Sequence, residues 1–138
     1  MDVETSRVLY ELTQKYHDLT NISFKRALRE GGLTILIIEH DRASPPIKRK
    51  SELVREIGRR LKTRIIMIKE NMGDIRELAR EIFSPAQIRG VNVLFKKEGE
   101  EYHIKITRED LMLLPASIDV LQTLLAKVTD KKIKLVFE

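Results

Sequence analysis

The chain has 138 residues, of which 42% are hydrophobic and 34% are charged, and it contains no cysteine. This composition supports a folded core, and the length allows one ordinary domain or two very small ones. The absence of cysteine excludes disulfides, thiolate metal sites and cysteine nucleophiles, and it fits a reducing compartment. The N-terminal segment lacks the layout of a signal peptide, and no apolar run approaches the about 20 residues that span a bilayer. We therefore expect a cytoplasmic protein without a membrane partner.

The net charge of +5 is concentrated in one segment of the chain. Residues 48–64 contain eight Lys or Arg residues and only two acidic residues, which gives a local net charge of +6. Residues 1–66 together carry +5, whereas residues 67–138 contain 12 basic and 12 acidic residues. A concentrated charge of this kind predicts a surface for a polyanion, whereas dispersed Lys and Arg would indicate only solubility. If a polyanion binds, we expect the first half of the chain to dominate.

The first half of the chain predicts the order helix, strand, strand, helix, strand. Apolar residues recur at helical spacing in the first segment, and two β-like runs then flank Gly31-Gly32, which is typical of a hairpin. Ser44 and the two prolines after it are typical of the start of a one-turn helix, and Ser51 is placed to cap a longer helix. The inward face of that longer helix is predicted to be Val54, Ile57 and Leu61. The other predicted elements of this half are residues 4–19, 22–30, 33–38 and 64–70.

The second half repeats this order. Thr107 is placed to cap a short helix that runs to Leu114, where Pro115 breaks it. The other predicted elements are a helix at residues 74–83, strands at 88–95 and 102–106 joined by a turn at 96–100, a helix near 118–128 and a strand at 132–138. The closing runs RIIMIKE and KIKLVFE begin 68 residues apart, about half the chain. We infer two copies of one α-β-β-α-α-β unit, at residues 1–70 and 71–138, joined near residues 71–73.

Each unit is expected to be an α+β arrangement, in which helices cover one face of a three-stranded mixed sheet. Two stretches carry a family resemblance: the junction Arg80–Ile88, where a helix ends in Ser-Pro-Ala before a strand, and the helix–strand pair Val54–Glu70. Together with the element order, they resemble the tandem type II KH domains of the transcription termination/antitermination factor NusA, in its short archaeal form. The resemblance implies a basic first KH-like domain at residues 1–70 and a neutral second one at residues 71–138.

The loop that binds RNA in KH domains is degenerate in both units. A functional KH domain carries Gly-x-x-Gly between two adjacent helices, where the backbone approaches phosphates at a helix N-terminus. The resemblance places this loop at Lys48-Arg49-Lys50-Ser51 in the first unit and around Leu113–Ser117 in the second. Neither loop contains glycine, and the second also lacks a cation. The resemblance therefore implies that RNA contact depends on side-chain cations of the first unit.

The candidate RNA-binding residues all belong to the basic segment of the first unit: Lys48, Arg49, Lys50, Ser51, Arg55, Arg59 and Lys62. Arg55, Arg59 and Lys62 recur at helical spacing, which places them on one face of the predicted helix, and Arg60 and Arg64 extend the patch. An ordinary solvated helix face, partly paired with Glu52 and Glu56, remains the alternative. For the loop around Leu113–Ser117, a structural connection and a protein-contact surface both remain open.

No motif in the sequence indicates an enzyme. The three histidines are scattered without metal-ligand spacing, the Gly31-Gly32 pair matches no phosphate-binding loop, and no motif pairs two carboxylates. We therefore expect no catalytic residues, no metal, no cofactor and no small-molecule substrate. Two functions remain. The first is an RNA-binding transcription factor, acting in termination, antitermination or elongation, that contacts single-stranded RNA through the first unit. The alternative is a protein-interaction module that docks on RNA polymerase with little or no RNA binding.

Overall fold

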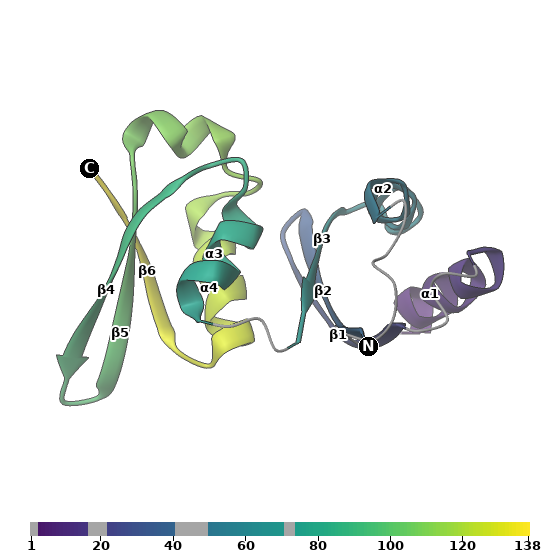
Figure 1. Ribbon diagram of the computed structural model, residues 1–138, viewed down its shortest axis with the longest axis horizontal. Helices are drawn as coiled ribbons and strands as arrows, with labels where there is room; N and C mark the ends of the chain where they lie inside the picture. The colour runs from purple at the N-terminus through teal and green to yellow at the C-terminus, as the bar shows by residue number, and fades with distance from the viewer. Residues whose placement is uncertain (1–2, 17–21, 41–49, 71–73) are drawn as a thin grey trace. The chain divides into compact units, whose positions relative to one another are not determined.

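The computed structural model describes residues 3–16, 22–40, 50–70 and 74–138. The chain divides into two compact units, Met1–Asn71 and Met72–Glu138 (Figure 1). Each unit contains a three-stranded mixed sheet packed with helices, so the α+β fold class predicted from the sequence is confirmed, and it is consistent with tandem KH-like domains. The predicted joint at residues 71–73 and the predicted one-turn helix at Ser44 lie outside the described residues.

The sheet of the first unit has the strand order β1-β2-β3. β1 and β2 pair antiparallel around a turn at Gly31, whose φ of 57° lies in the left-handed region that glycine adopts without steric cost. β2 and β3 pair parallel, and the connection between them contains α2. The elements of this unit are α1 (Val3–Lys15), β1 (Ile22–Glu30), β2 (Leu33–His40), α2 (Lys50–Leu61) and β3 (Arg64–Lys69).

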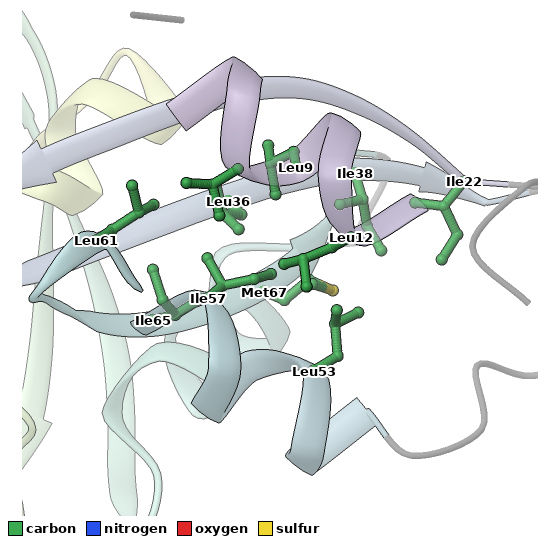
Figure 2. Packing of buried hydrophobic residues seen from close by; sticks show 11 residues of the cluster. Leu9, Leu12, Ile22, Leu36, Ile38, Leu53, Ile57, Leu61, Ile65 and Met67 are labelled. Carbon is green, nitrogen blue, oxygen red and sulfur yellow. The ribbon is translucent and has the colours of Figure 1, made fainter. Parts of the chain in front are cut away.

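The two helices of the first unit lie on one face of its sheet and form a core with it (Figure 2). On α2 the buried side chains are Leu53, Ile57 and Leu61, which recur every four residues and therefore share one face. Burial of one such aliphatic side chain contributes about 1.5–3 kcal/mol. The prediction for this face is confirmed at Ile57 and Leu61, whereas Val54 is only partly buried and Leu53 takes the inward position.

The start of α2 differs from the prediction. Lys50 is already helical, so Ser51 lies inside the first turn and does not cap the helix. The prediction for Ser51 was wrong because a cap at Ser51 would make Glu52 the first helical residue, whereas the helix already includes Lys50, two residues earlier.

The end of α2 is a tight return into β3. Lys62 follows the helix with φ of 56°, and the Thr63 amide donates to the Gly58 carbonyl at 3.0 Å. This pattern is a Schellman motif, in which the left-handed residue is usually glycine. The Arg29 guanidinium donates to the Leu61 carbonyl at 3.1 Å, and the hydroxyls of Thr63 and Thr34 are 3.0 Å apart. The return is therefore fixed to β1 and β2 as well as to the helix.

The sheet of the second unit has the order β4-β5-β6, with β4–β5 antiparallel and β5–β6 parallel. Only two residues connect β4 and β5, because Gly99 at φ 125° pairs directly with Lys96, so the five-residue turn predicted here was too long. The elements are α3 (Ile75–Phe83), β4 (Ile88–Lys96), β5 (Gly99–Ile106), the 3-10 helix η2 (Arg108–Leu113), α4 (Ile118–Thr129) and β6 (Lys132–Phe137). No helix in the described ranges is long and apolar enough to cross a membrane.

Side-chain caps begin the helices of the second unit. Thr107 accepts from the Asp110 amide at 3.3 Å, which confirms the predicted cap, and Ser117 accepts from the Val120 amide at 3.3 Å at the start of α4. The Asp110 carboxylate accepts from the Gln87 amide at 2.9 Å and so ties η2 to the junction before β4. At the other end of α4, Asp130 adopts φ of 56°, 68 residues after Lys62. The two units therefore end their last helix in the same conformation.

Gly58 is required by the return of the chain into β3. A Cβ atom at this position would lie 2.7 Å from the Thr63 carbonyl oxygen, which is closer than non-bonded atoms approach. We expect Gly58→Ala to lower the free energy of unfolding by about 1–3 kcal/mol through this clash, although alanine favours a helix interior. The midpoint of urea denaturation measures the effect. Gly32→Ala is the matched control, because a Cβ at Gly32 has no atom within 4 Å, and equal stability of the two variants would contradict the prediction.

Candidate nucleic-acid interface

The candidate RNA-binding residues that the structure describes lie along α2 or directly after it. Lys50 and Ser51 form its first turn, Arg55 and Arg59 lie one turn apart in its middle, and Lys62 follows its last residue. All five are exposed. Lys48 and Arg49 lie outside the described residues. Half of the loop expected at residues 48–51 is therefore the first turn of the helix itself.

Arg55 and Arg59 are brought together at a shallow hollow of about 320 Å³ between α1 and α2. The hollow is lined by Lys15, Tyr16, Glu52, Arg55, Glu56 and Arg59. The inward face of α2 is apolar, so residues 55 and 59 turn away from the core toward solvent. Neither arginine forms a hydrogen bond or an ion pair with any residue in the described ranges. Both guanidinium groups are therefore available to a ligand.

Glu56 is held by α1. Its carboxylate accepts from the Tyr16 hydroxyl at 2.6 Å and from the Lys15 ammonium at 3.2 Å. The Tyr16 hydrogen bond first, and then the Lys15 hydrogen bond, hold the pKa of Glu56 below its usual value. Sequence spacing had predicted partners for Glu56 on its own helix, but α1 supplies them. Arg59 acts on the Glu56 carboxylate through its charge, without a hydrogen bond to it.

Arg60 has a different role from its neighbours. It forms an ion pair with Glu11 of α1, and the Arg60 hydrogen bond is the main reason why the pKa of Glu11 is lowered. This pair joins the two helices, so Arg60 contributes less to the exposed basic patch than the sequence predicted. Lys62 does not share a helix face with Arg55 and Arg59, although the sequence spacing had predicted that it would. α2 ends at Leu61, and Lys62 follows it in the left-handed conformation.

The corresponding region of the second unit is apolar and exposed. Residues 114–117 connect η2 to α4, and Ser117 caps the second of these helices. Directly before them, Leu111, Met112 and Leu113 are 40%, 90% and 44% exposed. Sequence reasoning left a protein-contact surface open for the loop around Leu113–Ser117, but it made no prediction of exposure for Leu111 and Met112 in the short helix before it. In the described part of the chain, no group of three His, Asp or Glu side chains is placed to hold a metal ion.

Comparison with known proteins supports the fold. No protein-family model and no curated protein matches the chain. Among solved structures, the chain is similar to "Crystal structure of APE1850", with a TM-score of 0.60 and 16% sequence identity. The match covers 94% of this chain and 96% of that one. At this identity the likeness concerns the fold, and it extends over nearly the whole of both chains.

The Tyr16–Glu56 hydrogen bond makes stability depend on pH. A carboxylate whose pKa is lowered on folding stabilises the protein above its unfolded pKa, and this contribution is lost as the pH falls through the folded pKa. We expect Tyr16→Phe to raise the pKa of Glu56 toward its usual value and to weaken the acid dependence of stability below about pH 4.5. NMR titration of the Glu56 carboxyl carbon measures the shift. Tyr10→Phe, an exposed change on the same helix, is the control, and an unmoved Glu56 pKa in Tyr16→Phe would contradict the assignment.

The backbone conformation of Lys62 predicts that glycine is more stable at this position. A non-glycine residue in the left-handed region costs roughly 1 kcal/mol. We expect Lys62→Gly to raise the free energy of unfolding by about that amount, measured by urea denaturation. Lys62→Ala removes the same charge and keeps the unfavourable conformation, so it should show no gain. The explanation fails if the glycine and alanine variants are equally stable.

Proposed function

We propose that this protein is an RNA-binding transcription factor of the NusA-like type, which contacts single-stranded RNA through its basic first unit. The observation that carries the proposal is the pair of exposed arginines on α2, Arg55 and Arg59, which have no ion-pair partner in the described ranges and share one hollow. The tandem α+β arrangement and the structural likeness over nearly the full chain support the class of protein.

The geometry of α2 suits phosphate groups. Arg55 and Arg59 are separated by one helical turn, about 6 Å along the axis, and a guanidinium group can donate two parallel hydrogen bonds to one phosphate. Lys50 begins the helix, where the helix dipole adds partial positive charge, and Lys48 and Arg49 precede it in sequence. Side-chain cations on this surface would replace the backbone contacts that a glycine loop makes.

Binding of this kind is governed by charge more than by sequence. The hollow contains no exposed row of aromatic rings for base stacking, and its lining side chains are mainly cations and carboxylates. We therefore expect modest sequence specificity and strong dependence on salt, with the logarithm of affinity falling by about 0.7 per neutralised phosphate for each logarithmic unit of salt.

A second candidate function is docking on RNA polymerase through the second unit. The observation in its favour is the exposed apolar run on η2, where Met112 is 90% exposed between Leu111 and Leu113. Contiguous exposed apolar side chains are typical of protein-contact surfaces, whereas scattered single ones are ordinary. The two functions are compatible, because a factor docked on polymerase can also contact the transcript.

Fluorescence anisotropy with a short labelled single-stranded RNA tests the first function. Titrations at about 50 and 200 mM salt give both affinity and salt slope. We expect Arg55→Glu with Arg59→Glu to weaken binding and to lower the slope by about 0.7 for each phosphate that is no longer neutralised. Substitution of Lys48, Arg49 and Lys50 by Glu should act in the same direction. The matched control is Arg76→Glu with Arg80→Glu, two exposed arginines at the same spacing on α3, which should bind like the wild type.

Equal affinity and slope in the wild type and both first-unit variants would overturn the RNA-binding role of α2. The second function is then favoured if the wild type co-purifies with RNA polymerase and Met112→Ser abolishes that association. Circular dichroism of each variant shows whether the fold is kept, so that weaker binding is not confused with unfolding.

A further inference from the structure

Within residues 74–138, one face of the sheet of the second unit carries no helix. Figure 1 shows α3 and α4 together on the other side of this sheet. In β5, Ile104 and Ile106 are fully buried, so the alternate residues Glu101, His103 and Lys105 point to the opposite face. In β6, Ile133 and Leu135 are buried, which directs Lys132 and Lys134 to that same face. We call this surface the open face.

The strand register gathers positive charge on the open face. Lys134 lies opposite His103, and Lys132 lies opposite Glu101. Lys96 joins them from β4, because its ammonium contacts the Glu101 carboxylate at 2.6 Å. The strand residues of the open face, all within the described residues 74–138, thus include four lysines, Lys96, Lys105, Lys132 and Lys134, and one carboxylate, while Glu98 at the hairpin tip contacts the Lys132 ammonium at 3.8 Å. The second unit has no net charge as a sequence, but its other acidic residues lie on or beside helices, at the hairpin tip or beyond the strands, apart from Glu100, which precedes Glu101 in β5 and therefore points to the helix-covered face.

The strand carboxylate of the open face, that of Glu101, already has partners. Glu101 accepts from Lys96, and its other close partner is His103, at 3.1 Å. The Lys96 hydrogen bond first, and then that of His103, lower the pKa of Glu101 to about 2. Lys105 and Lys134 form no hydrogen bond or ion pair with any described residue, and Lys134 is exposed. These two lysines are therefore available to an external anion.

The arrangement favours an extended polyanion over a small one. The lysines occupy all three strands, neighbouring strands lie about 4.8 Å apart, and alternate residues such as Lys132 and Lys134 are separated by about 6.6 Å. Between the cations lie Asn92 and His103, directly paired across β4 and β5. The Asn92 amide and the His103 ring nitrogen that does not contact Glu101 can hydrogen-bond to base edges. Gly90, paired with Lys105, leaves open space where another residue would carry a side chain.

We propose that the open face, centred on Lys105 and Lys134, is a second contact surface for single-stranded RNA, separate from α2. Its ligand class rests on the proposed function. Lysines supply the phosphate contacts, and Asn92 and His103 supply polar contacts to bases. The even balance of charge in the second half of the sequence is therefore misleading, because the second unit separates its charges between faces.

The test uses the full chain and the same labelled single-stranded RNA, at about 50 and 200 mM salt. Lys105→Glu with Lys134→Glu should bind roughly tenfold more weakly and lower the salt slope by about 0.7 for each phosphate that these lysines neutralise. Combined with Arg55→Glu and Arg59→Glu, the weakening should exceed that of either pair alone. If the open-face variant binds RNA more weakly and the Arg55/Arg59 variant binds it as tightly as the wild type, this proposal is supported and the role of α2 is overturned. The reverse result would overturn this proposal and leave the role of α2 intact.

A second variant tests the open face by an increase in RNA affinity, which unfolding would not produce. Glu101→Gln removes the one carboxylate that the strands place on the open face and releases Lys96, so RNA affinity should rise about threefold. Glu109→Gln, an exposed change of the same kind on η2, is the matched control and should bind like the wild type. Unchanged affinity in Glu101→Gln would count against the open face. Binding of polyglutamate but not RNA, abolished in the Lys105/Lys134 variant, would overturn the proposal in favour of an acidic protein partner.

Discussion

The close return of α2 into β3 is the constraint on which the first unit depends. A parallel strand pair needs a crossover, and here the crossover helix must end within two residues of the strand that it feeds. Gly58 makes this possible, because it lets the Thr63 carbonyl approach the helix without a side chain between them. Once this end is fixed, the spacing of Leu53, Ile57 and Leu61 sets the rotation of the helix, and Arg55 and Arg59 must face outward.

The second unit makes the corresponding return from its last helix into its last strand with different residues. The residues 68 positions after Gly58 and Lys62 are Ala126 and Asp130, and Asp130 keeps the left-handed conformation of Lys62. Its amide donates to the Ala126 carbonyl at 2.8 Å, whereas in the first unit the bond to Gly58 comes from Thr63, one residue later. The second unit, with alanine at position 126, thus ends its helix with the simpler single-bond cap. The first unit, with glycine at position 58, ends its helix with the tighter Schellman motif. The duplicated plan thus keeps one backbone shape with different residues.

Much of the fold could be predicted from periodicity, because each helix and strand buries one face. The strand at 22–30 and the last helix and strand of each unit follow from apolar spacing alone. Each failure depends on a feature that apolar spacing does not determine. The helix start at Lys50 and the turn at Gly99 depend on backbone angles that side-chain patterns do not specify. The partners of Glu56 lie about 40 residues away and depend on how α1 packs against α2. The open face likewise requires the strand register, which charge counting cannot supply.

The Lys96–Glu101–His103 cluster has a consequence for how the open face meets an anion. Lys96 is already paired with the Glu101 carboxylate. A phosphate that binds Lys96 therefore replaces that carboxylate, and the binding free energy gains little from this lysine. Lys105 and Lys134 have no described partner to give up, so they would supply most of the net attraction. On the surface proposed to bind RNA, an internal competitor of this kind would weaken the attraction for any polyanion and so limit non-specific binding.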